Sequence, residues 1–190
     1  CISENETILA SSMGEAKSMQ AERLFEHIDN VLDKTNKTLE DIDYFAINLG
    51  PGSFTGIRIG LAAILAISFA LDKKLVGVST LESLAYNAHK KNNLKNISTA
   101  LNAQRGDIFV QDFKIEDNII QSISEPKMVP AEEVSDADIG NMDICKIISS
   151  PNAEDIAYAA YQMIKNNIAD FERKEPIYIR PPDAKKSNSS

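Results

Sequence analysis

The chain has 190 residues, of which 43 % are hydrophobic, so it can bury a core as one domain or as two small lobes. Its 28 acidic and 20 basic residues give a net charge of -8, which argues against unaided nucleic-acid binding because phosphate contacts need lysine and arginine. Cys1 and Cys145 are too few for a disulfide framework, and no basic region leads into an apolar signal segment, so we expect a cytoplasmic protein with free thiols.

The N-terminal part of the sequence changes from strand to helix periodicity. A turn at Glu4-Asn5-Glu6 predicts a hairpin whose second strand covers residues 7–10. From residue 17 or 18 to residue 34, apolar side chains recur at three- and four-residue steps, which predicts an amphipathic helix. Its apolar positions are Ala21, Leu24, Phe25, Ile28, Val31 and Leu32. His27 lies off this stripe, and we interpret it as a solvated surface residue.

Residues 50–71 are the most distinctive stretch of the sequence. A short apolar strand at residues 44–49 leads into Gly50-Pro51-Gly52, which predicts a tight turn, and Ser53 or Thr55 caps a helix that runs to about Leu71. Glycines permit positive φ and a close approach of other backbone, so this turn can hold an anion or pack against a neighbouring segment. Its spacing matches neither a Walker loop nor a dinucleotide-binding loop.

The helix after this turn is apolar nearly all round. From Ile57 to Leu71 its only charge is Arg58, and Gly60 together with four alanines gives it a smooth surface. Such a helix is expected to be buried on more than one side. The residue pattern alone favours a central core helix, and the alternative is a helix covered on one side by a partner chain. Charges near both ends leave it short of the roughly 18 apolar residues of a membrane span.

The following segments alternate strand and helix. We predict a strand at residues 75–78, and Ser79-Thr80-Leu81-Glu82 is a capping box that opens a helix. The apolar side of that helix consists of Leu81, Leu84, Ala85 and Ala88. Two strands that alternate with two helices in this order are typical of a parallel sheet with crossover helices.

The second half of the chain is richer in strands. Strands are predicted at residues 97–102, 108–115 and 119–123, and a turn at Arg105-Gly106-Asp107 joins the first two. The charges of that turn are interpreted as exposed. Residues 125–142 are interpreted as a polar, acidic connection to which we assign no chemistry.

The C-terminal part predicts one more strand and one more helix. The strand covers residues 144–148, and the helix begins with Ser150 as its cap and Pro151 at its first position. Its inner face consists of Ile156, Ala159, Ala160, Met163 and Ile164. Beyond Phe171, prolines exclude a continuous helix, so we expect residues 177–179 to lie extended against the body and residues 185–190 to be loose.

The residues by themselves offer no catalytic centre. The sequence contains no Gly-x-Ser-x-Gly elbow and no Cys-x-x-Cys pair, and Cys145 lies in an apolar segment. Only His27 and His89 are present, so a histidine-based metal centre is close to excluded. A catalyst that acts alone is therefore not expected.

A family resemblance begins at the glycine turn. Residues 50–60, Gly-Pro-Gly-Ser-Phe-Thr-Gly-Ile-Arg-Ile-Gly, resemble the signature of the bacterial TsaB (YeaZ) family. Residues 77–84, 100–109 and 176–185 agree with it in order, so the resemblance spans most of the chain. Members of that family are partner subunits in making the threonylcarbamoyladenosine modification of tRNA, on the adenosine next to the anticodon.

The resemblance implies a fold and a division of the chain. The expected fold is an α/β fold of the actin-like or sugar-kinase-like (ASKHA) kind, with two lobes, mixed sheets and crossover helices. Residues 1–95 would form the N-terminal lobe, with the glycine turn and the partner-facing helices, and residues 96–190 a smaller C-terminal lobe. Family members begin with a strand that ends in Asp-Thr-Ser, which this chain lacks before Cys1.

The resemblance also implies a non-catalytic role. The catalytic TsaD relatives carry a metal-binding His-x-x-x-His pair, and this sequence has Thr80 and Leu84 at the corresponding positions, neither of which can replace a histidine ligand. No cofactor of its own is therefore expected. ATP or ADP and a metal ion are expected on partner subunits, which include a TsaE-type ATPase, and tRNA is expected to be reached only through the complex.

The resemblance places the partner contacts on two helices. The TsaD-type paralogue would bind where the helix of residues 17–34 lies beside the helix after the glycine turn. The candidate partner-binding residues are Ala21, Leu24, Phe25, Ile28, Arg58, Leu61, Leu65 and Phe69. The glycine turn is a second candidate site, made by Gly50, Pro51, Gly52, Ser53, Phe54, Thr55 and Gly56.

Two alternatives stay open at this point. The first is a stand-alone actin-like nucleotide-binding ATPase or kinase, which would need a phosphate-gripping loop after the strand that the family has before Cys1. The second is a homodimer whose smooth helices pack on each other, with Gly60 and the alanines allowing a close approach. Pairing with the paralogue and self-pairing would use the same surface and compete.

Overall fold

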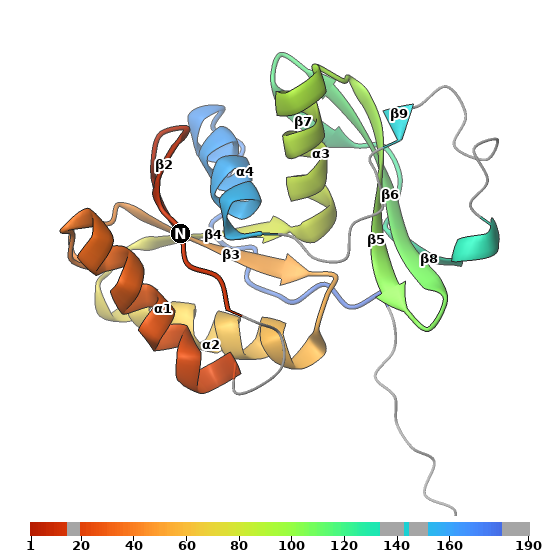
Figure 1. The fold of residues 1–190 in the computed structure, drawn as a ribbon. Coiled ribbons are helices and arrows are strands. Elements are labelled where there is room, and N and C mark those ends of the chain that lie inside the picture. The colour runs from red at the N-terminus through yellow and green to blue at the C-terminus, as the bar shows by residue number, and fades with distance from the viewer. Residues whose placement is uncertain (15–19, 134–142, 145–151, 180–190) are drawn as a thin grey trace, which may run out of the picture.

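A computed structural model describes residues 1–14, 20–133, 143–144 and 152–179 (Figure 1). The helices are α1 (Gln20–Thr35), α2 (Phe54–Ala70), α3 (Thr80–Asn92) and α4 (Ala153–Lys165), with a short 3-10 helix, η1, at Ala131–Glu133. The strands are β1 (Ile2–Glu4), β2 (Thr7–Ala10), β3 (Tyr44–Gly50), β4 (Lys74–Ser79), β5 (Asn96–Gln104), β6 (Asp107–Glu116), β7 (Ile119–Ser122), β8 (Lys127–Pro130) and β9 (Asp143–Ile144).

The predicted hairpin and parallel pair are present, and the structure adds a strand that was not predicted. β1 and β2 form an antiparallel hairpin, and β3 and β4 run parallel on either side of the α2 crossover. The other strands form a sheet in the order β7-β6-β5-β9, in which only the β5–β9 pair is parallel. The addition is β8, which pairs with β6. The interpretation of residues 125–142 as a polar connection therefore missed the strand Lys127–Pro130.

The parallel pair lies between two layers of helices. In Figure 1, α2 covers one face of β3 and β4, whereas α4 and α3 lie on the other face. Because successive strand residues point to opposite faces, Leu49 and Leu75 pack with Leu61 of α2, while Val76 and Val78 pack against α4. The core is thus divided between the two faces of a small sheet.

Helix α3 joins the parallel pair to the larger sheet. Its capping box is present: Oγ of Ser79 accepts from the amide of Leu81 at 3.2 Å, and Oε2 of Glu82 accepts from the amide of Ser79 at 2.8 Å. The predicted apolar side is buried and packs against β5 and β6, which confirms that prediction. Tyr86, on another side of the helix, packs against α4.

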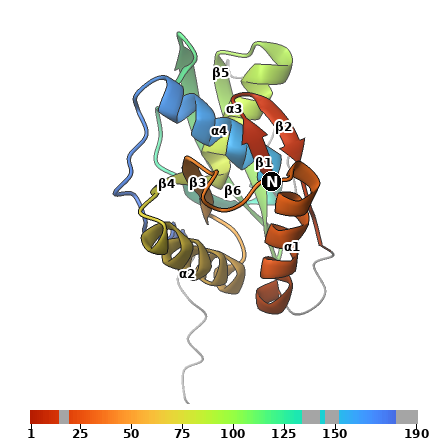
Figure 2. The same ribbon diagram turned by 90° about the vertical axis from the view of Figure 1, so that its left-hand side faces the viewer.

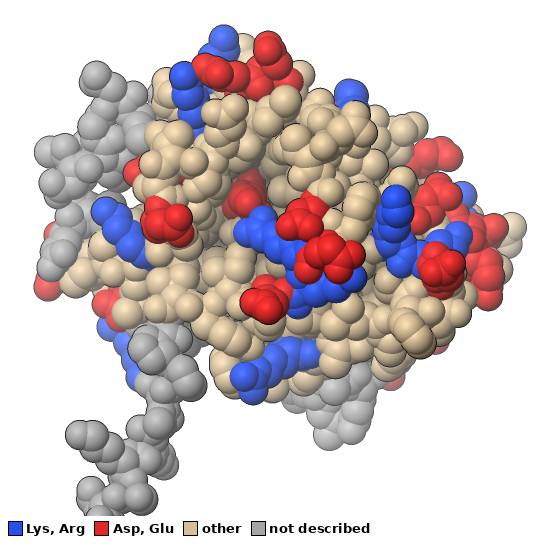
Figure 3. Space-filling view, turned by 180° about the vertical axis from the view of Figure 1, so that it is seen from behind, with Lys and Arg blue, Asp and Glu red and all other residues tan. Residues whose placement is uncertain are grey.

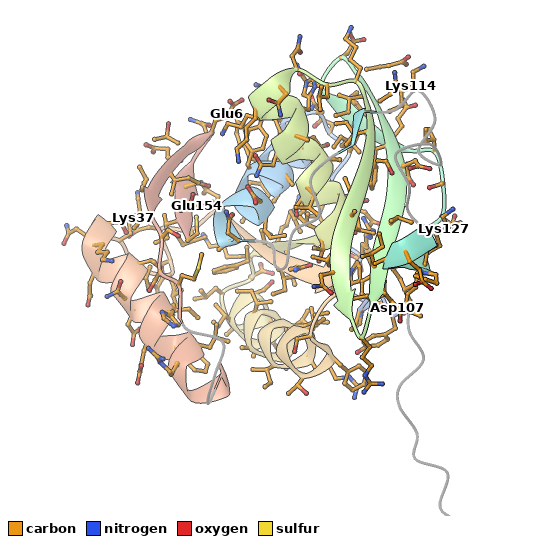
Figure 4. All side chains as sticks on the ribbon, turned by 45° about the vertical axis from the view of Figure 1, so that its right-hand side comes forward. Glu6, Lys37, Asp107, Lys114, Lys127 and Glu154 are labelled. Atoms are coloured by element: carbon orange, nitrogen blue, oxygen red, sulfur yellow. The ribbon has the colours of Figure 1, made fainter. Side chains whose placement is uncertain are left out.

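Helix α4 connects the two halves of the chain. It lies beyond residue 95 but packs against β3, β4 and α3, and its predicted inner face is mostly buried. It also holds the N-terminal hairpin, because Oε1 of Glu6 accepts from Nε2 of Gln162 at 3.0 Å and lies 3.4 Å from Nζ of Lys165. Figure 4 labels Glu6 at the tip of this hairpin. The division into lobes at residues 95 and 96 stays a prediction.

Two local predictions are corrected by the structure. The cap of α4 is Asn152 and not Ser150, because Oδ1 of Asn152 accepts from the amide of Asp155 at 2.7 Å. Ser150 and Pro151 lie outside the described residues, as do the predicted strand residues 145–148 and the predicted loose end at residues 185–190. His27 is half-buried rather than solvated, since its Nδ1 lies 2.8 Å from Oγ of Ser12. In the described ranges, no helix combines the length and the apolar character needed to cross a membrane.

Candidate partner-binding face

The glycine turn places α2 and receives the C-terminal segment. Oγ of Ser53 accepts from the amide of Gly56 at 3.3 Å, so Ser53 rather than Thr55 is the cap, and α2 begins at Phe54. Gly50 has a φ of 101°, and a Cβ there would lie 2.8 Å from Cδ1 of Ile57 and 3.0 Å from the carbonyl oxygen of Ile177. Only glycine fits this position without strain.

The segment around Ile177 lies extended against the body, as predicted. The amide of Ile177 donates to the carbonyl oxygen of Leu49 at 2.7 Å, and its side chain packs into the core below α2. The glycine turn therefore packs against a neighbouring segment of the same chain. That is one of the two roles the sequence left open for it.

Arg58 lies against two aromatic rings. Its guanidinium is 3.8 Å from the ring centre of Phe54, Nε donates to the hydroxyl of Tyr178 at 2.8 Å, and the two rings are 5.0 Å apart. A cation in the first turns of a helix is disfavoured by the helix dipole, and the cation–π contacts offset that cost. The sequence identified Arg58 and Phe54 as candidates, but it gave no signal for Tyr178, which is 120 residues away from Arg58.

Helices α1 and α2 lie side by side at one end of the molecule (Figures 1 and 2). The most exposed of the large hydrophobic side chains on them are Phe69, which is 91 % exposed, and Phe25, which is 54 % exposed. Ala62, Ala66 and Ala70 are exposed on α2 as well. These five residues are called the α1–α2 face below.

The other predicted contact residues differ in how much surface they offer. Leu24, Ile28 and Leu65 are half-buried, and Arg58 is exposed. Leu61 is 7 % exposed and packs into the core with Leu75, so it offers almost no surface to a partner. Ala21 lies in α1, and its side chain is outside the described ones.

Helix α2 is not the central core helix that its residue pattern favoured. Of its residues only Ile57, Leu61 and Ser68 are buried. The helix has the parallel pair on one side and α1 beside it, and the remaining side carries apolar residues in the open. The exposed side of an apolar helix is the feature that the alternative, a partner chain, would explain.

Thr80 and Leu84 have structural roles. The hydroxyl of Thr80, which is fully buried, lies 2.7 Å from the carbonyl oxygen of Pro51 and 2.8 Å from Oδ1 of Asn48. This contact ties the start of α3 to the glycine turn. Leu84 is 3 % exposed and belongs to the core against the larger sheet. In the part of the chain that the structure describes, no three His, Cys, Asp or Glu residues are grouped so that they could hold a metal ion.

The surface charges do not form a nucleic-acid footprint on the face that Figure 3 shows. Acidic and basic side chains lie close to one another there, and no broad basic patch is visible. A protein that tracks a phosphate backbone needs lysine and arginine gathered on one face. That the chain does not bind nucleic acid unaided stays a prediction from its net charge of -8.

Comparison with known proteins agrees with this architecture. The model of the family described as "TsaD: tRNA N6-adenosine threonylcarbamoyltransferase" matches residues 14–173. A solved structure titled "Crystal structure of an uncharacterized protein with similarity to peptidase YEAZ from Pseudomonas aeruginosa" superposes with a TM-score of 0.69 at 21 % identity, covering 85 % of each chain. The fold is therefore the actin-like ASKHA fold, in its mixed α/β form.

Curated relatives narrow the class to a family. The protein "tRNA threonylcarbamoyladenosine biosynthesis protein TsaB" of Escherichia coli (strain K12) is 26 % identical over 184 residues, 84 % of this chain and 80 % of that protein. The protein of the same name from Buchnera aphidicola subsp. Schizaphis graminum is 40 % identical over 82 residues, 43 % of this chain and 39 % of that protein. The chain belongs to the family of the TsaD model and, within it, to the TsaB (YeaZ) proteins.

Proposed function

We propose that this chain is a non-catalytic subunit in tRNA threonylcarbamoyladenosine biosynthesis, and that it binds and activates a TsaD-type transferase through the α1–α2 face. The observation that carries the proposal is the exposure of Phe69, at 91 %, on a helix whose only charge from Ile57 onward is Arg58. The names of the curated relatives support the pathway.

The energetics of the α1–α2 face favour a partner. Burying a phenylalanine is worth about 1.5 to 3 kcal/mol, and aromatic side chains in the middle of an interface often contribute most of its binding energy. The three alanines on α2 allow another helix to approach closely. Arg58, the single charge of α2, is engaged by Phe54 and Tyr178, and on α1 Nε of Arg23 lies 3.9 Å from Oε2 of Glu26 beside Phe25. A docking helix would therefore meet no charge on α2 that lacks a partner.

The non-catalytic part of the proposal rests on two positions. Thr80 and Leu84 stand where the catalytic relatives carry histidines, and both are used for packing and hydrogen bonding within this chain. The metal ion, and the ATP or ADP, would then belong to the TsaD-type and TsaE-type subunits. The tRNA would be reached through the complex, in keeping with the net charge of -8.

The proposal can be tested by binding the chain to the TsaD-type paralogue of the same organism. We expect Phe69→Glu to weaken the complex by about 30-fold or more, because an anchor is lost and a charge would have to be buried. The matched control is Ile123→Glu, since Ile123 is 55 % exposed next to β7 on the other sheet. Circular dichroism of both variants checks that each is folded.

The activity measurement separates this proposal from its alternatives. Threonylcarbamoyl transfer to tRNA is assayed with each protein alone and with both, and we expect product only with both. Transfer or ATP hydrolysis by this chain alone would overturn the proposal in favour of a stand-alone enzyme. Unchanged binding by Phe69→Glu would place the interface elsewhere. Light scattering of the chain alone shows whether the same face supports a homodimer, which Phe69→Glu should then dissociate.

A further inference from the structure

A cavity lies beside α3, between the end of α4 and the start of β7. Its volume is about 200 Å³, and it is bounded by α3, the end of α4, the start of β7 and the segment that follows α4. Ile120, Met163 and Ile168 give it apolar walls. An engineered protein cavity of about 150 Å³ holds a benzene molecule, so this one has room for a ring with a short substituent.

A buried hydroxyl without a partner borders the cavity. Tyr86 is 2 % exposed, and within the described ranges its hydroxyl has no partner that meets hydrogen-bond geometry. Burial raises the pKa of Tyr86 to about 12, and the nearby amide of Ile120 lowers it only in part. Ile120 and Glu82, which both act on this hydroxyl, also line the cavity. A buried polar group is normally satisfied, so this one calls for a ligand or for water.

The charges at the cavity do not cancel. Nη1 of Arg173 lies 2.9 Å from both carboxylate oxygens of Glu82, so those two charges compensate each other. Asp170 also lines the cavity, and its Oδ1 accepts from the amide of Glu172 at 2.9 Å. In the ion pairs found among the described residues, Asp170 has no lysine or arginine partner. Asp170 is exposed, so one negative charge without an ion-pair partner lies where the cavity meets solvent.

We propose that this cavity binds a small organic cation, an ammonium group carried on an apolar ring or short chain. The apolar part lies against Ile120, Met163 and Ile168, and the ammonium group pairs with Asp170. An ammonium has three donors, and the oxygen of Tyr86 is an acceptor that lacks one. An anion would meet the uncompensated carboxylate, so it is disfavoured. The site is independent of the α1–α2 face and of any TsaD-type partner.

The ligand class can be tested with three probes of the same shape and different charge. Benzylammonium, benzyl alcohol and benzoate are titrated separately into the whole chain at pH 7, and ¹H–¹⁵N and methyl spectra are recorded. We expect saturable shifts for benzylammonium at residues such as Ile120, Met163 and Ile168. Benzyl alcohol should bind at least about five-fold more weakly, because it lacks the charge, and benzoate should not saturate.

Variants show whether the binding uses these residues. Asp170→Asn should reduce the affinity for benzylammonium to that of benzyl alcohol, while Glu172→Gln, which changes an exposed acid two residues away, should leave it unchanged. Ile168→Trp should block the cavity; Ile168 is 40 % exposed, so the fold should tolerate the change. The absence of saturation at about 10 mM, equal binding of all three probes, or unchanged binding by Asp170→Asn would each overturn the proposal and leave water as the partner of Tyr86.

Discussion

Helices α2 and α3 begin in the same way, but they differ in how much of each helix is buried. Each follows a strand of the parallel pair, and each is capped by a serine, Ser53 or Ser79. Yet α2, the more apolar helix, buries only three residues, whereas α3 buries more than half of its residues. The burial of a helix within one chain depends on the elements that lie on its sides, and its composition alone does not decide it.

The surroundings explain this difference. Helix α3 has α4 on one side and β5 and β6 on another, so even its threonine and serine side chains are enclosed. Helix α2 has β3 and β4 on one side and α1 beside it. Its open side remains apolar although nothing in the described chain covers it. The proposed transferase partner would give α2 the second covered side that α3 obtains from its own chain.

The largest effect should come from truncating a buried residue of α3, with an exposed residue of α2 truncated for comparison. Leu81→Ala in α3 removes a fully buried side chain, and we expect it to lower the free energy of unfolding by about 2 to 5 kcal/mol. Phe69→Ala in α2 removes a larger side chain that is 91 % exposed, and it should change stability by less than about 0.5 kcal/mol. Urea unfolding of the two variants measures both values. Similar losses in both would mean that α2 is covered in the isolated chain.

Alanine substitutions at two glycines, Gly77 and Gly60, provide a second comparison, between two backbone positions. A Cβ at Gly77 in β4 would lie 2.2 Å from the carbonyl oxygen of Arg173, so Gly77→Ala should cost about 3 kcal/mol. A Cβ at Gly60 in α2 would lie 3.3 Å from Cδ1 of Ile47, an atom that can move. Alanine is more favourable than glycine inside a helix by about 1 kcal/mol, so Gly60→Ala should leave the stability unchanged or raise it slightly. Thermal unfolding measures both, and a destabilised Gly60→Ala would show that this side of α2 is tightly packed.

The buried hydroxyl of Tyr86 in α3 should make the free energy of unfolding fall at alkaline pH. Tyr86 has its pKa raised from 10 to about 12, so the folded state favours its neutral form. The contribution of this group to the free energy of unfolding is fully present below pH 10. It is lost as the pH rises from 10 to 12, and the loss amounts to about 2 to 3 kcal/mol. Tyr86→Phe should remove this loss and be no less stable at pH 7, since it removes a hydroxyl without a partner.

Urea unfolding of Tyr86→Phe at pH 7, 10 and 11.5 measures this effect against the wild type. The control is Tyr161→Phe, on the half-exposed side of α4. Tyr158, whose pKa burial also raises, remains in every variant. If Tyr86→Phe loses as much stability above pH 10 as the wild type, another group titrates in that window.

The sequence predicted local structure well where the signal is local. The cap at Ser53 and the box of Ser79 and Glu82 depend on residues within a few positions of one another. The parallel pair joins strands on either side of α2, and it was predicted because each strand and the helix between them has a local signal. β8 was missed because Lys127–Pro130 lies in a polar stretch and becomes a strand only by pairing with β6. The exposure of α2 could not be predicted from its own residues, since it depends on which elements pack beside it.

In the candidate site, too, some contacts could be predicted from residues close together in the sequence, and others could not. Phe54 and Arg58 are four residues apart on one helix, so their contact follows from helical geometry. Tyr178 reaches Arg58 only because the glycine turn admits the segment of Ile177, which is a property of the folded chain. Phe69 was identified as a contact residue, but its exposure, which makes it the best test of the α1–α2 face, came only from the structure.

A loss of stability smaller than those of Leu81→Ala and Gly77→Ala is expected where the C-terminal segment meets α2. Tyr178→Ala removes a hydrogen bond to Nε of Arg58 and a ring 5.6 Å from the guanidinium, both on the exposed side of the molecule. We expect a loss of about 1 kcal/mol, and about half of that for Tyr178→Phe, which keeps the ring. Urea unfolding measures both. A loss above about 3 kcal/mol for Tyr178→Ala would show that the start of α2, although no other element covers it, depends on this segment as α3 depends on α4.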